Sequence, residues 1–317
     1  MSAYGGIDLG GTKIQAVVID EDCNVLGSAR RATPTSGGPP EVLGELAAAM
    51  RDASAAVELE ATELAGVGVG TPGRVEEGSV REARNLPDWE ATFPLGRELS
   101  KELGVSVKVG NDVHVATEAE FRLGAGRLYQ SLLGVFWGTG VGGAMILDGR
   151  LWRGRGGAGE IGHMVVEIDG ARCTCGRKGC MEAYAGRASM ERHAQKLVEK
   201  GRRTKLFELM HERGRTRLTS GVWARALEHH DKLAEQIIDR AVVALAAGIA
   251  SAQNLIDVDG VILGGGLGVR LGHPYAKRIS EAMAPHLFAD AHPHVHVAAL
   301  GDLGGAIGAA LLVRGDG

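Results

Sequence analysis

The chain has 317 residues and a formal net charge of −4, so it is long enough for two lobes and has no basic excess of the kind that binds nucleic acid. The N-terminal segment lacks the basic and apolar regions of a signal peptide, and no uninterrupted apolar segment is long enough to cross a bilayer. We therefore expect a cytoplasmic protein without nucleic-acid or membrane partners. In that reducing compartment, clustered Cys and His residues favour metal binding over disulfides.

The first part of the chain is predicted to begin with a strand, a glycine turn and a second strand, because Val- and Ile-rich segments flank the turn. Predicted strands cover residues 4–9, 14–19, 25–31, 64–70 and 105–109. Predicted helices cover residues 41–57 and 112–123. Strands that alternate with helices indicate an α/β fold.

The same order restarts near residue 132, which indicates an internal duplication of topology with little similarity between residues. Predicted strands cover residues 132–137, 144–147, 260–263 and 295–300. Predicted helices cover residues 182–201, 231–256 and 304–312, and a further helix follows residue 266. The basic and polar stretch 201–221 is predicted to be a mobile surface element.

Two glycine-rich turns between strands are candidate phosphate sites. The first contains Asp8, Gly10, Gly11, Thr12 and Lys13, and the second contains Gly138, Thr139, Gly140 and Gly142. Bare backbone N–H groups bind phosphate oxygens, an ammonium group adds positive charge, and a carboxylate holds Mg²⁺ directly or through water. The sequence has no P-loop motif, and the second turn leads into a strand, which excludes the dinucleotide-binding context. Each turn alone is equally typical of a tight hairpin, but the pair predicts a polyphosphate held between two lobes.

One segment carries three of the four cysteines and a nearby histidine. Its candidate metal ligands are His163, Cys173, Cys175 and Cys180. Thiolates and a neutral imidazole are ligands that tetrahedral Zn²⁺ prefers, and four protein ligands leave no position for water, so the pattern predicts a structural zinc site. The alternatives are a disulfide and a chance cluster of inert thiols. Glu160 and Glu182 flank these ligands and are candidates for a neighbouring binding pocket.

Taken in order, these motifs make the chain resemble the ROK family (repressors, open-reading-frame proteins and sugar kinases) of the actin/hexokinase/Hsp70-like ATPase superfamily. The resemblance covers essentially the whole chain and is greatest to the bacterial glucokinases. It is carried by DLGGTK at 8–13, ND at 111–112, GTGVGG at 138–143, GEIGH at 159–163, CTCGRKGCME at 173–182 and VILGGGLG at 261–268.

The resemblance implies a two-lobed fold of duplicated ribonuclease-H-like domains with a structural zinc site. The smaller lobe would comprise residues 1–115 with the helix 304–317 packed back on it, and the larger lobe residues 116–303 with the zinc motif and the oligomer interface. The implied activity is ATP-dependent phosphorylation of the 6-hydroxyl of glucose, with Mg²⁺ on the phosphates. The implied assembly is a homodimer or homotetramer.

The resemblance also implies residue roles. Asp112 is the implied catalytic base, and Asn111 hydrogen-bonds the sugar, although a simple helix N-cap explains either residue alone. The side chains implied to contact ring hydroxyls are Glu160, His163 and Glu182, with one nitrogen of His163 on zinc and the other on the sugar. Gly73 and Asn85 match a loop that closes over the sugar, and Gly265 and Gly266 match the adenosine side.

Departures from the family pattern leave the sugar open. Gly186 replaces the usual Ser, and His114, at a usually small position, is predicted to be a packing or surface residue. The alternating histidines 292, 294 and 296 are predicted to be surface strand residues. The alternative substrates are fructose, mannose, allose, an N-acetylhexosamine and a cyclitol, and polyphosphate is an alternative donor. A sugar-sensing repressor would need a helix-turn-helix domain, for which no room precedes Asp8.

Overall fold

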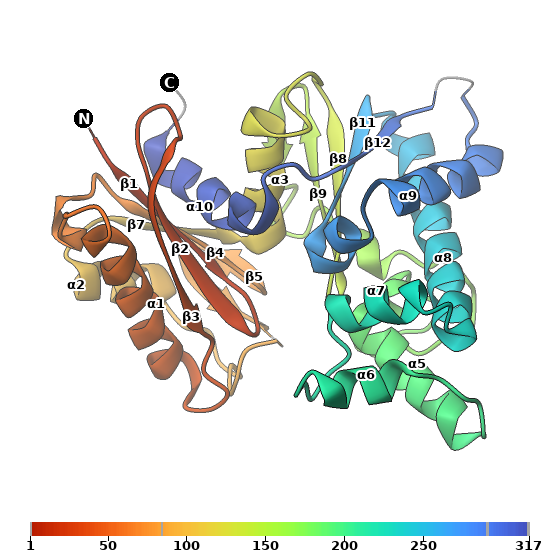
Figure 1. Ribbon diagram of the computed structural model, residues 1–317. Helices are drawn as coiled ribbons and strands as arrows, with labels where there is room; N and C mark the ends of the chain where they lie inside the picture. Colours follow the sequence, from red (N-terminus) through yellow and green to blue (C-terminus); the bar gives the residue numbers. More distant parts are fainter. Residues whose placement is uncertain (1, 84, 290–291, 316–317) are drawn as a thin grey trace. The chain divides into compact units, whose positions relative to one another are not determined.

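The computed structural model describes residues 2–83, 85–289 and 292–315, which form two compact units (Figure 1). The first unit comprises Met1–Arg127, Arg153–Ala158 and Ala299–Gly317. The second comprises Leu128–Trp152 and Gly159–Ala298. The predicted boundary lies after residue 115, whereas the whole helix α3 (Asp112–Leu123) belongs to the first unit, where it packs against α10 (Gly304–Arg314).

The first unit contains a five-stranded mixed sheet. In spatial order its strands are β3 (Val25–Ala32), β2 (Lys13–Ile19), β1 (Tyr4–Leu9), β4 (Val67–Thr71) and β7 (Val107–Asn111). The pairs β1–β2 and β2–β3 are antiparallel, and β1, β4 and β7 are parallel. The carboxyl ends of these three parallel strands therefore meet at one edge, where ligands bind in α/β sheets.

Helices cover both faces of this sheet. Successive residues of a strand point to opposite faces. A Cβ at Gly5 would contact Met50 of α1 (Gly38–Ala55), whereas a Cβ at Gly6 would contact Ala306 of α10, so these two helices lie on opposite faces (Figure 1). The helix α2 (Leu95–Leu103) packs on β7, and the strands β5 (Arg74–Glu76) and β6 (Ser79–Arg81) form a separate hairpin.

The small residues of α10 have a packing reason. A Cβ at Gly68 of β4 would overlap the backbone carbonyl oxygen of Ala309, and a Cβ at Gly308 would overlap that of Val115 in α3. The backbones of α10, β4 and α3 therefore approach more closely than any larger residue allows. This packing fixes the start of α10 beside the carboxyl end of β1.

The second unit repeats the topology of the first. Its sheet has the spatial order β10 (Arg150–Trp152), β9 (Val141–Leu147), β8 (Leu132–Trp137), β11 (Gly260–Gly264) and β12 (His294–Val297). The pairs β8–β9 and β9–β10 are antiparallel, and β8, β11 and β12 are parallel. The order and the directions match those of the first sheet, strand for strand, as the duplicated pattern in the sequence predicts.

The helices of the second unit differ from the prediction in one segment. They are α4 (Glu182–Ala185), α5 (Arg187–Glu199), α6 (Leu206–Glu212), α7 (Ser220–Glu228), α8 (Lys232–Ile256) and α9 (Gly265–Met283), with a break at Gly272 before Pro274 in α9. Residues 201–221, predicted to be a mobile surface element, are mostly exposed but contain the helix α6, which the sequence reasoning did not predict. Leu206, Leu209 and Met210 have helical spacing and are buried, and they anchor α6 to the core despite the basic residues around it.

The last strand also ends earlier than predicted. β12 ends at Val297. Ala298 N still donates to Leu263 O of β11 at 3.0 Å, but Ala299 N and Leu300 N donate to the carboxylate of Glu120 in α3 at 3.0 and 2.8 Å, so the strand does not continue. His292 and His294 are exposed, whereas His296 is half-buried and its Nε2 lies 2.6 Å from the Tyr129 hydroxyl.

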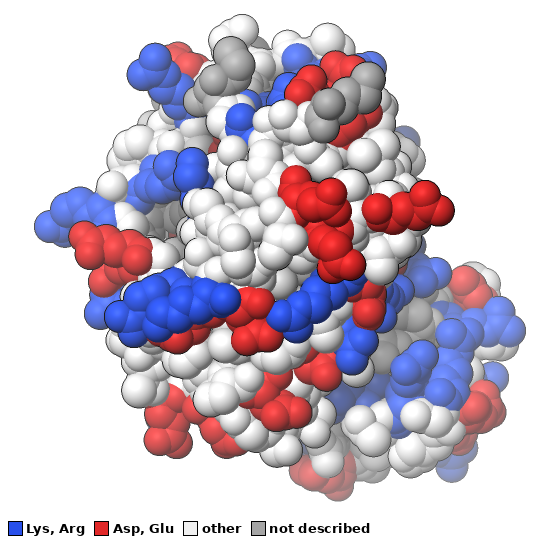
Figure 2. Space-filling model, turned by 90° about the vertical axis from the view of Figure 1, so that its left-hand side faces the viewer, with Lys and Arg blue, Asp and Glu red and all other residues white. Residues whose placement is uncertain are grey.

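Figure 2 shows basic and acidic side chains interspersed over most of the face that it draws, with a group of mainly basic side chains at its lower right. This pattern agrees with the small net charge of −4. Within the described part of the chain, no helix combines the length and the apolar character that a membrane span needs.

Candidate active site and metal-binding cluster

The first glycine loop is a tight turn between β1 and β2. Gly10 N donates to Lys13 O at 2.9 Å, and the Thr33 hydroxyl donates to Gly10 O at 2.6 Å. A Cβ on Gly11 would lie 2.9 Å from the carbonyl oxygen of Asn85, so only glycine allows these two segments to approach so closely. The loop and the segment at Asn85, both predicted to bind ligands, are therefore neighbours in the first unit.

Asp8 lies near the carboxyl end of β1, just before this loop. A Cβ on Gly305, in the first turn of α10, would lie 2.8 Å from the Asp8 carboxyl carbon. Burial raises the pKa of Asp8 to about 6, and the Lys13 ammonium partly opposes that effect. The Lys13 ammonium itself lies 3.5 Å from the exposed carboxylate of Asp302. A bound cation would stabilise the charged form of Asp8, so this carboxylate suits a divalent ion.

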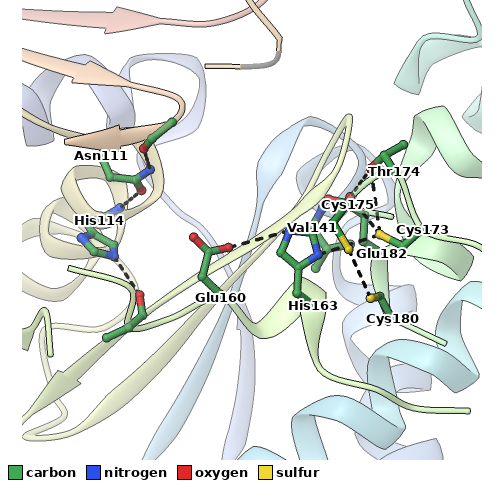
Figure 3. A network of polar contacts seen from close by, with 12 residues as sticks. Asn111, His114, Val141, Glu160, His163, Cys173, Thr174, Cys175, Cys180 and Glu182 are labelled. Atoms are coloured by element: carbon green, nitrogen blue, oxygen red, sulfur yellow. Dashed lines mark hydrogen bonds and ion pairs between the residues drawn. The ribbon is translucent and has the colours of Figure 1, made fainter. Parts of the chain in front are cut away.

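Asn111 and Asp112 lie where β7 passes into α3. Asn111 is the N-cap of α3: its Oδ1 accepts from Val113 N at 3.0 Å and from His114 N at 3.2 Å. Its Nδ2 donates to Gly73 O at 3.2 Å, so one side chain joins the helix start to the loop after β4 (Figure 3). Asp112, the first helical residue, is half-buried and accepts from Val113 N at 2.9 Å through Oδ1.

His114 contacts a second segment of the first unit. It is half-buried, and its Nε2 lies 3.3 Å from Ala158 O (Figure 3). This contact holds the short segment Arg153–Ala158 to α3. The packing or surface role predicted for His114 stays a prediction.

The second glycine loop lies beside Gly265 and Gly266, the first residues of α9, in the second unit. Gly138 N donates to Gly140 O at 3.0 Å, which closes the turn between β8 and β9, whereas Gly142 lies within β9 opposite Phe136. A Cβ on Gly138 would lie 3.9 Å from Gly266 N in the first turn of α9. The two segments meet because β8 and β11 are parallel neighbours, so their carboxyl ends share one edge.

Glu182, predicted to bind a sugar, makes contacts within the protein. Its Oε2 accepts from Val141 N at 3.0 Å, and its Oε1 accepts from the Thr174 hydroxyl at 3.1 Å (Figure 3). A Cβ on Gly140 would overlap the same carboxylate. Glu182 therefore ties the second glycine loop to the cysteine-rich segment, a role that no local sequence pattern indicates.

The three cysteines and His163 converge as their spacing predicts. All four ligand atoms lie within 4.8 Å of one another. Cys175 Sγ lies 3.7 Å from Cys180 Sγ, and Cys173 Sγ lies 3.9 Å from His163 Nδ1. Zinc–sulfur bonds of about 2.3 Å in a tetrahedron place neighbouring sulfurs about 3.8 Å apart, so the cluster has the size of a tetrahedral zinc site. The cysteines are free thiols rather than a disulfide pair.

The second nitrogen of His163 faces away from the cysteines. Its Nε2 lies 4.0 Å from Oε2 of Glu160, whose side chain is 64% exposed (Figure 3). The Nδ1 atom can therefore bind a metal while the Nε2–H remains a donor for another group. Glu160 is exposed, whereas Glu182 is half-buried and already accepts two hydrogen bonds.

The structure also shows residues beside the two glycine loops that no sequence motif had indicated. Thr33 and Asp302 contact the first loop, and Arg187 donates to the Thr139 hydroxyl of the second loop at 2.8 Å. The sequence contains one indication near Arg187: the preceding residue, Gly186, replaces the Ser that is usual in the family. Predicted site residues thus gather around two centres, one in each unit.

Comparison with known proteins identifies relatives over the whole chain. The sequence profile of the ROK family matches residues 4–316. A glucokinase from Thermotoga maritima is 32% identical over 88% of this chain and 88% of its own length. An N-acetylmannosamine kinase from Salmonella arizonae is 31% identical over 98% of both chains.

Solved structures give the same picture. A ROK family glucokinase from Streptomyces griseus, crystallised with glucose and AMPPNP, is 31% identical over 99% of both chains, with a TM-score of 0.84. The ROK hexokinase from Thermus thermophilus is 32% identical over 98% of this chain and 97% of its own, with a TM-score of 0.79.

Proposed function

Because this chain belongs to the ROK family and is a sugar kinase, we propose that it transfers the γ-phosphoryl group of ATP to the 6-hydroxyl group of glucose. The observation that carries the proposal is the likeness, over nearly the full length of both chains, to a glucokinase solved with glucose and AMPPNP. The positions of Asp112 and of the two glycine loops support the same chemistry.

We assign the role of general base to Asp112. Its carboxylate accepts the proton of the sugar hydroxyl while that oxygen forms a bond to the γ-phosphorus and the bond from phosphorus to the β-phosphate oxygen breaks, which releases ADP. Asn111 supports this role, because its cap fixes the helix turn that carries Asp112. Phosphoryl transfer depends mainly on such positioning, since the protein takes little part in covalent chemistry.

We assign the phosphates of ATP to the glycine loops. Gly10, whose own N–H closes the turn, would let the phosphates approach the backbone, and Gly11 and Thr12 would offer backbone N–H groups. Lys13 would add charge, and Asp8 would hold Mg²⁺ directly or through water. The second loop would contribute through Gly138, Thr139, Gly140 and Gly142, and the start of α9 through Gly265 and Gly266 on the adenosine side. Magnesium would neutralise the charge that develops on the phosphates.

We assign Zn²⁺ to His163, Cys173, Cys175 and Cys180, whose mutual distances fit a tetrahedral ion. With four protein ligands the ion would have a structural role: it would hold the cysteine-rich segment in shape and fix the tautomer of His163. The Nε2–H of His163 and the exposed carboxylate of Glu160 would then contact sugar hydroxyls. We also propose that Glu182 contacts the sugar. Its carboxylate would do so while it accepts hydrogen bonds from Val141 N and the Thr174 hydroxyl.

A second candidate substrate is an N-acetylhexosamine. The relative named N-acetylmannosamine kinase aligns over 98% of this chain at 31% identity, close to the identity of the glucokinases. Epimers and N-acetyl derivatives differ at one or two ring positions, so a few contacts decide between them. We expect two residues of the first unit to influence that choice: Gly73, whose carbonyl accepts from Asn111, and Asn85, which lies beside Gly11.

The test is a coupled assay of ADP formation with glucose, mannose, fructose, allose, N-acetylglucosamine and N-acetylmannosamine. We expect the highest kcat/KM with glucose, and a higher value with an N-acetylhexosamine would overturn the assignment of the substrate. Asp112→Asn should lower kcat by about 10²- to 10⁴-fold. Glucose binding, measured by calorimetry, should remain near that of the wild type. An Asp112→Asn protein with nearly normal kcat would refute the assigned base.

We further propose that the protein forms a homodimer or homotetramer, which light scattering can test.

A further inference from the structure

Arg187 is fixed beside the second glycine loop. Its Nη2 donates to the Thr139 hydroxyl at 2.8 Å, and its Nη1 donates to the Ser220 hydroxyl at 3.2 Å. The backbone N–H of Arg187 donates to Gly138 O at 3.1 Å. The guanidinium is thus held in one place by groups from the loop and from α7, although Arg187 itself begins α5.

Among the described residues, the Arg187 guanidinium forms no ion pair, and Glu191, which acts on its charge from one turn further along α5, is paired with Arg217. Both side-chain partners of Arg187 are neutral hydroxyls. The first turn of α5 has no acidic residue, and the partial positive charge at a helix start disfavours a cation there. Burial lowers the pKa of Arg187 from its ordinary value, although Glu191 partly opposes this effect. A half-buried cation in this setting needs an anion.

The surroundings of the guanidinium are suited to phosphate. Thr139 belongs to the turn between β8 and β9, and Ser220 lies close to the start of α9, since a Cβ on Gly266 would be 3.4 Å from its hydroxyl. Gly266 brings a backbone N–H group of the first turn of α9 to the same place, since a Cβ on Gly138 would lie 3.9 Å from Gly266 N. An arginine has five N–H donors, and two hydroxyl contacts leave further donors for oxygen atoms of a ligand.

We propose that Arg187 binds the phosphate chain of the phosphoryl donor at the second glycine loop. The inference rests on the proposed function, which it deepens by naming a donor-binding residue in the second unit. Arginine pairs with phosphate through charge-assisted hydrogen bonds, which are about twice as strong as neutral ones. Arg187 would then contribute to the affinity for the donor without taking part in sugar binding.

A purely structural role makes a different prediction. If Arg187 only ties Thr139 to Ser220, its loss would weaken all ligands of the second unit alike, including those without phosphate. If it binds phosphate, its loss weakens only phosphate-bearing ligands. Lysine keeps the charge but lacks the planar fork, so Arg187→Lys should lie between the wild type and Arg187→Gln.

The experiment is calorimetric titration of the full-length protein with ATP, ADP and adenosine. Arg187→Gln should raise the Kd for ATP and ADP by about tenfold or more, from the loss of a hydrogen bond between charged groups. The Kd for adenosine should change less than about twofold, since adenosine has no phosphate. The matched control is Arg192→Gln, five residues further along α5, where the side chain is exposed and bound to Ser189. This control should leave all three Kd values unchanged.

The outcomes separate the inference from the proposed function. If the wild type binds no ATP, the proposed function fails. If it binds ATP and Arg187→Gln binds ATP equally well, or loses adenosine and ATP to the same degree while Arg187→Lys does the same, the inference is overturned. Tripolyphosphate is a second probe. If Arg187→Gln binds tripolyphosphate more weakly than the wild type does, Arg187 also contacts the phosphates of a donor that has no nucleoside. If the two proteins bind it equally well, Arg187 contacts the phosphates of nucleotides alone.

Discussion

The dual contact of Asn111 permits a sharp test of how the candidate base is held. The cap of α3 uses Oδ1, and the link to the loop after β4 uses Nδ2. A lost N-cap costs about 1 kcal/mol, and a lost neutral hydrogen bond about 1 kcal/mol. Asn111→Ala removes both and should lower the free energy of unfolding of the first unit by about 2 kcal/mol. Asn111→Ser keeps a cap and should lose about 1 kcal/mol.

The assay is equilibrium unfolding in urea, combined with steady-state kinetics. Asn111→Ala should also reduce kcat, because a frayed first turn no longer fixes Asp112. In Asn111→Ser the cap persists but the Gly73 carbonyl loses its donor, so the main effect should be a higher KM for the sugar. The reasoning is refuted if Asn111→Ala unfolds at the wild-type urea concentration, or if the Ser and Ala variants are equally destabilised.

Two further predictions concern metal and packing. Cys175→Ser removes one of the four ligands and should reduce bound zinc, measured by mass spectrometry of the purified protein, to well below one ion per chain; full zinc content would contradict the assigned site. Gly68→Ala places a methyl group on a backbone carbonyl of α10 and should cost about 1–3 kcal/mol or more in urea unfolding. Its control, Gly44→Ala on an exposed turn of α1 with open space around it, should stabilise the helix by about 0.5–1 kcal/mol. Equal stability of the two variants would contradict the packing argument.

Much of the site could be predicted because its signals are local. The cysteine spacing predicts a cluster that the structure brings within ligand distance, and the glycine turns at Gly10 and Gly138 lie between the predicted strands. The strands 4–9 and 132–137 have the predicted bounds. Periodicity of two and of 3.6 residues depends only on neighbouring residues, so long strands and helices such as α8 are accessible to sequence reasoning.

The structure departs from the predictions where burial overrides composition. Residues 201–221 look solvated because their charged side chains outnumber the apolar ones, yet Leu206 and Leu218 are fully buried and fix the segment to the core. A few apolar residues at helical spacing stabilise a helix even when its surface is basic. In the same way, the strand predicted to reach residue 300 ends early, because Glu120 supplies acceptors from a distant part of the chain.

The sequence by itself determined which chemical groups this protein has and how they are grouped along the chain: two glycine-rich turns, a pair of polar residues after a strand, and a cluster of three cysteines with a histidine. Only the tertiary structure decided which of those groups are already engaged. Asn111 is bound to Gly73, 38 residues away, and Glu182 to Val141, 41 residues away, while Arg187 forms no ion pair among the described residues. Hydrogen-bond partners separated this far in sequence are brought together only by packing of the sheet and helices, so no local pattern can specify them.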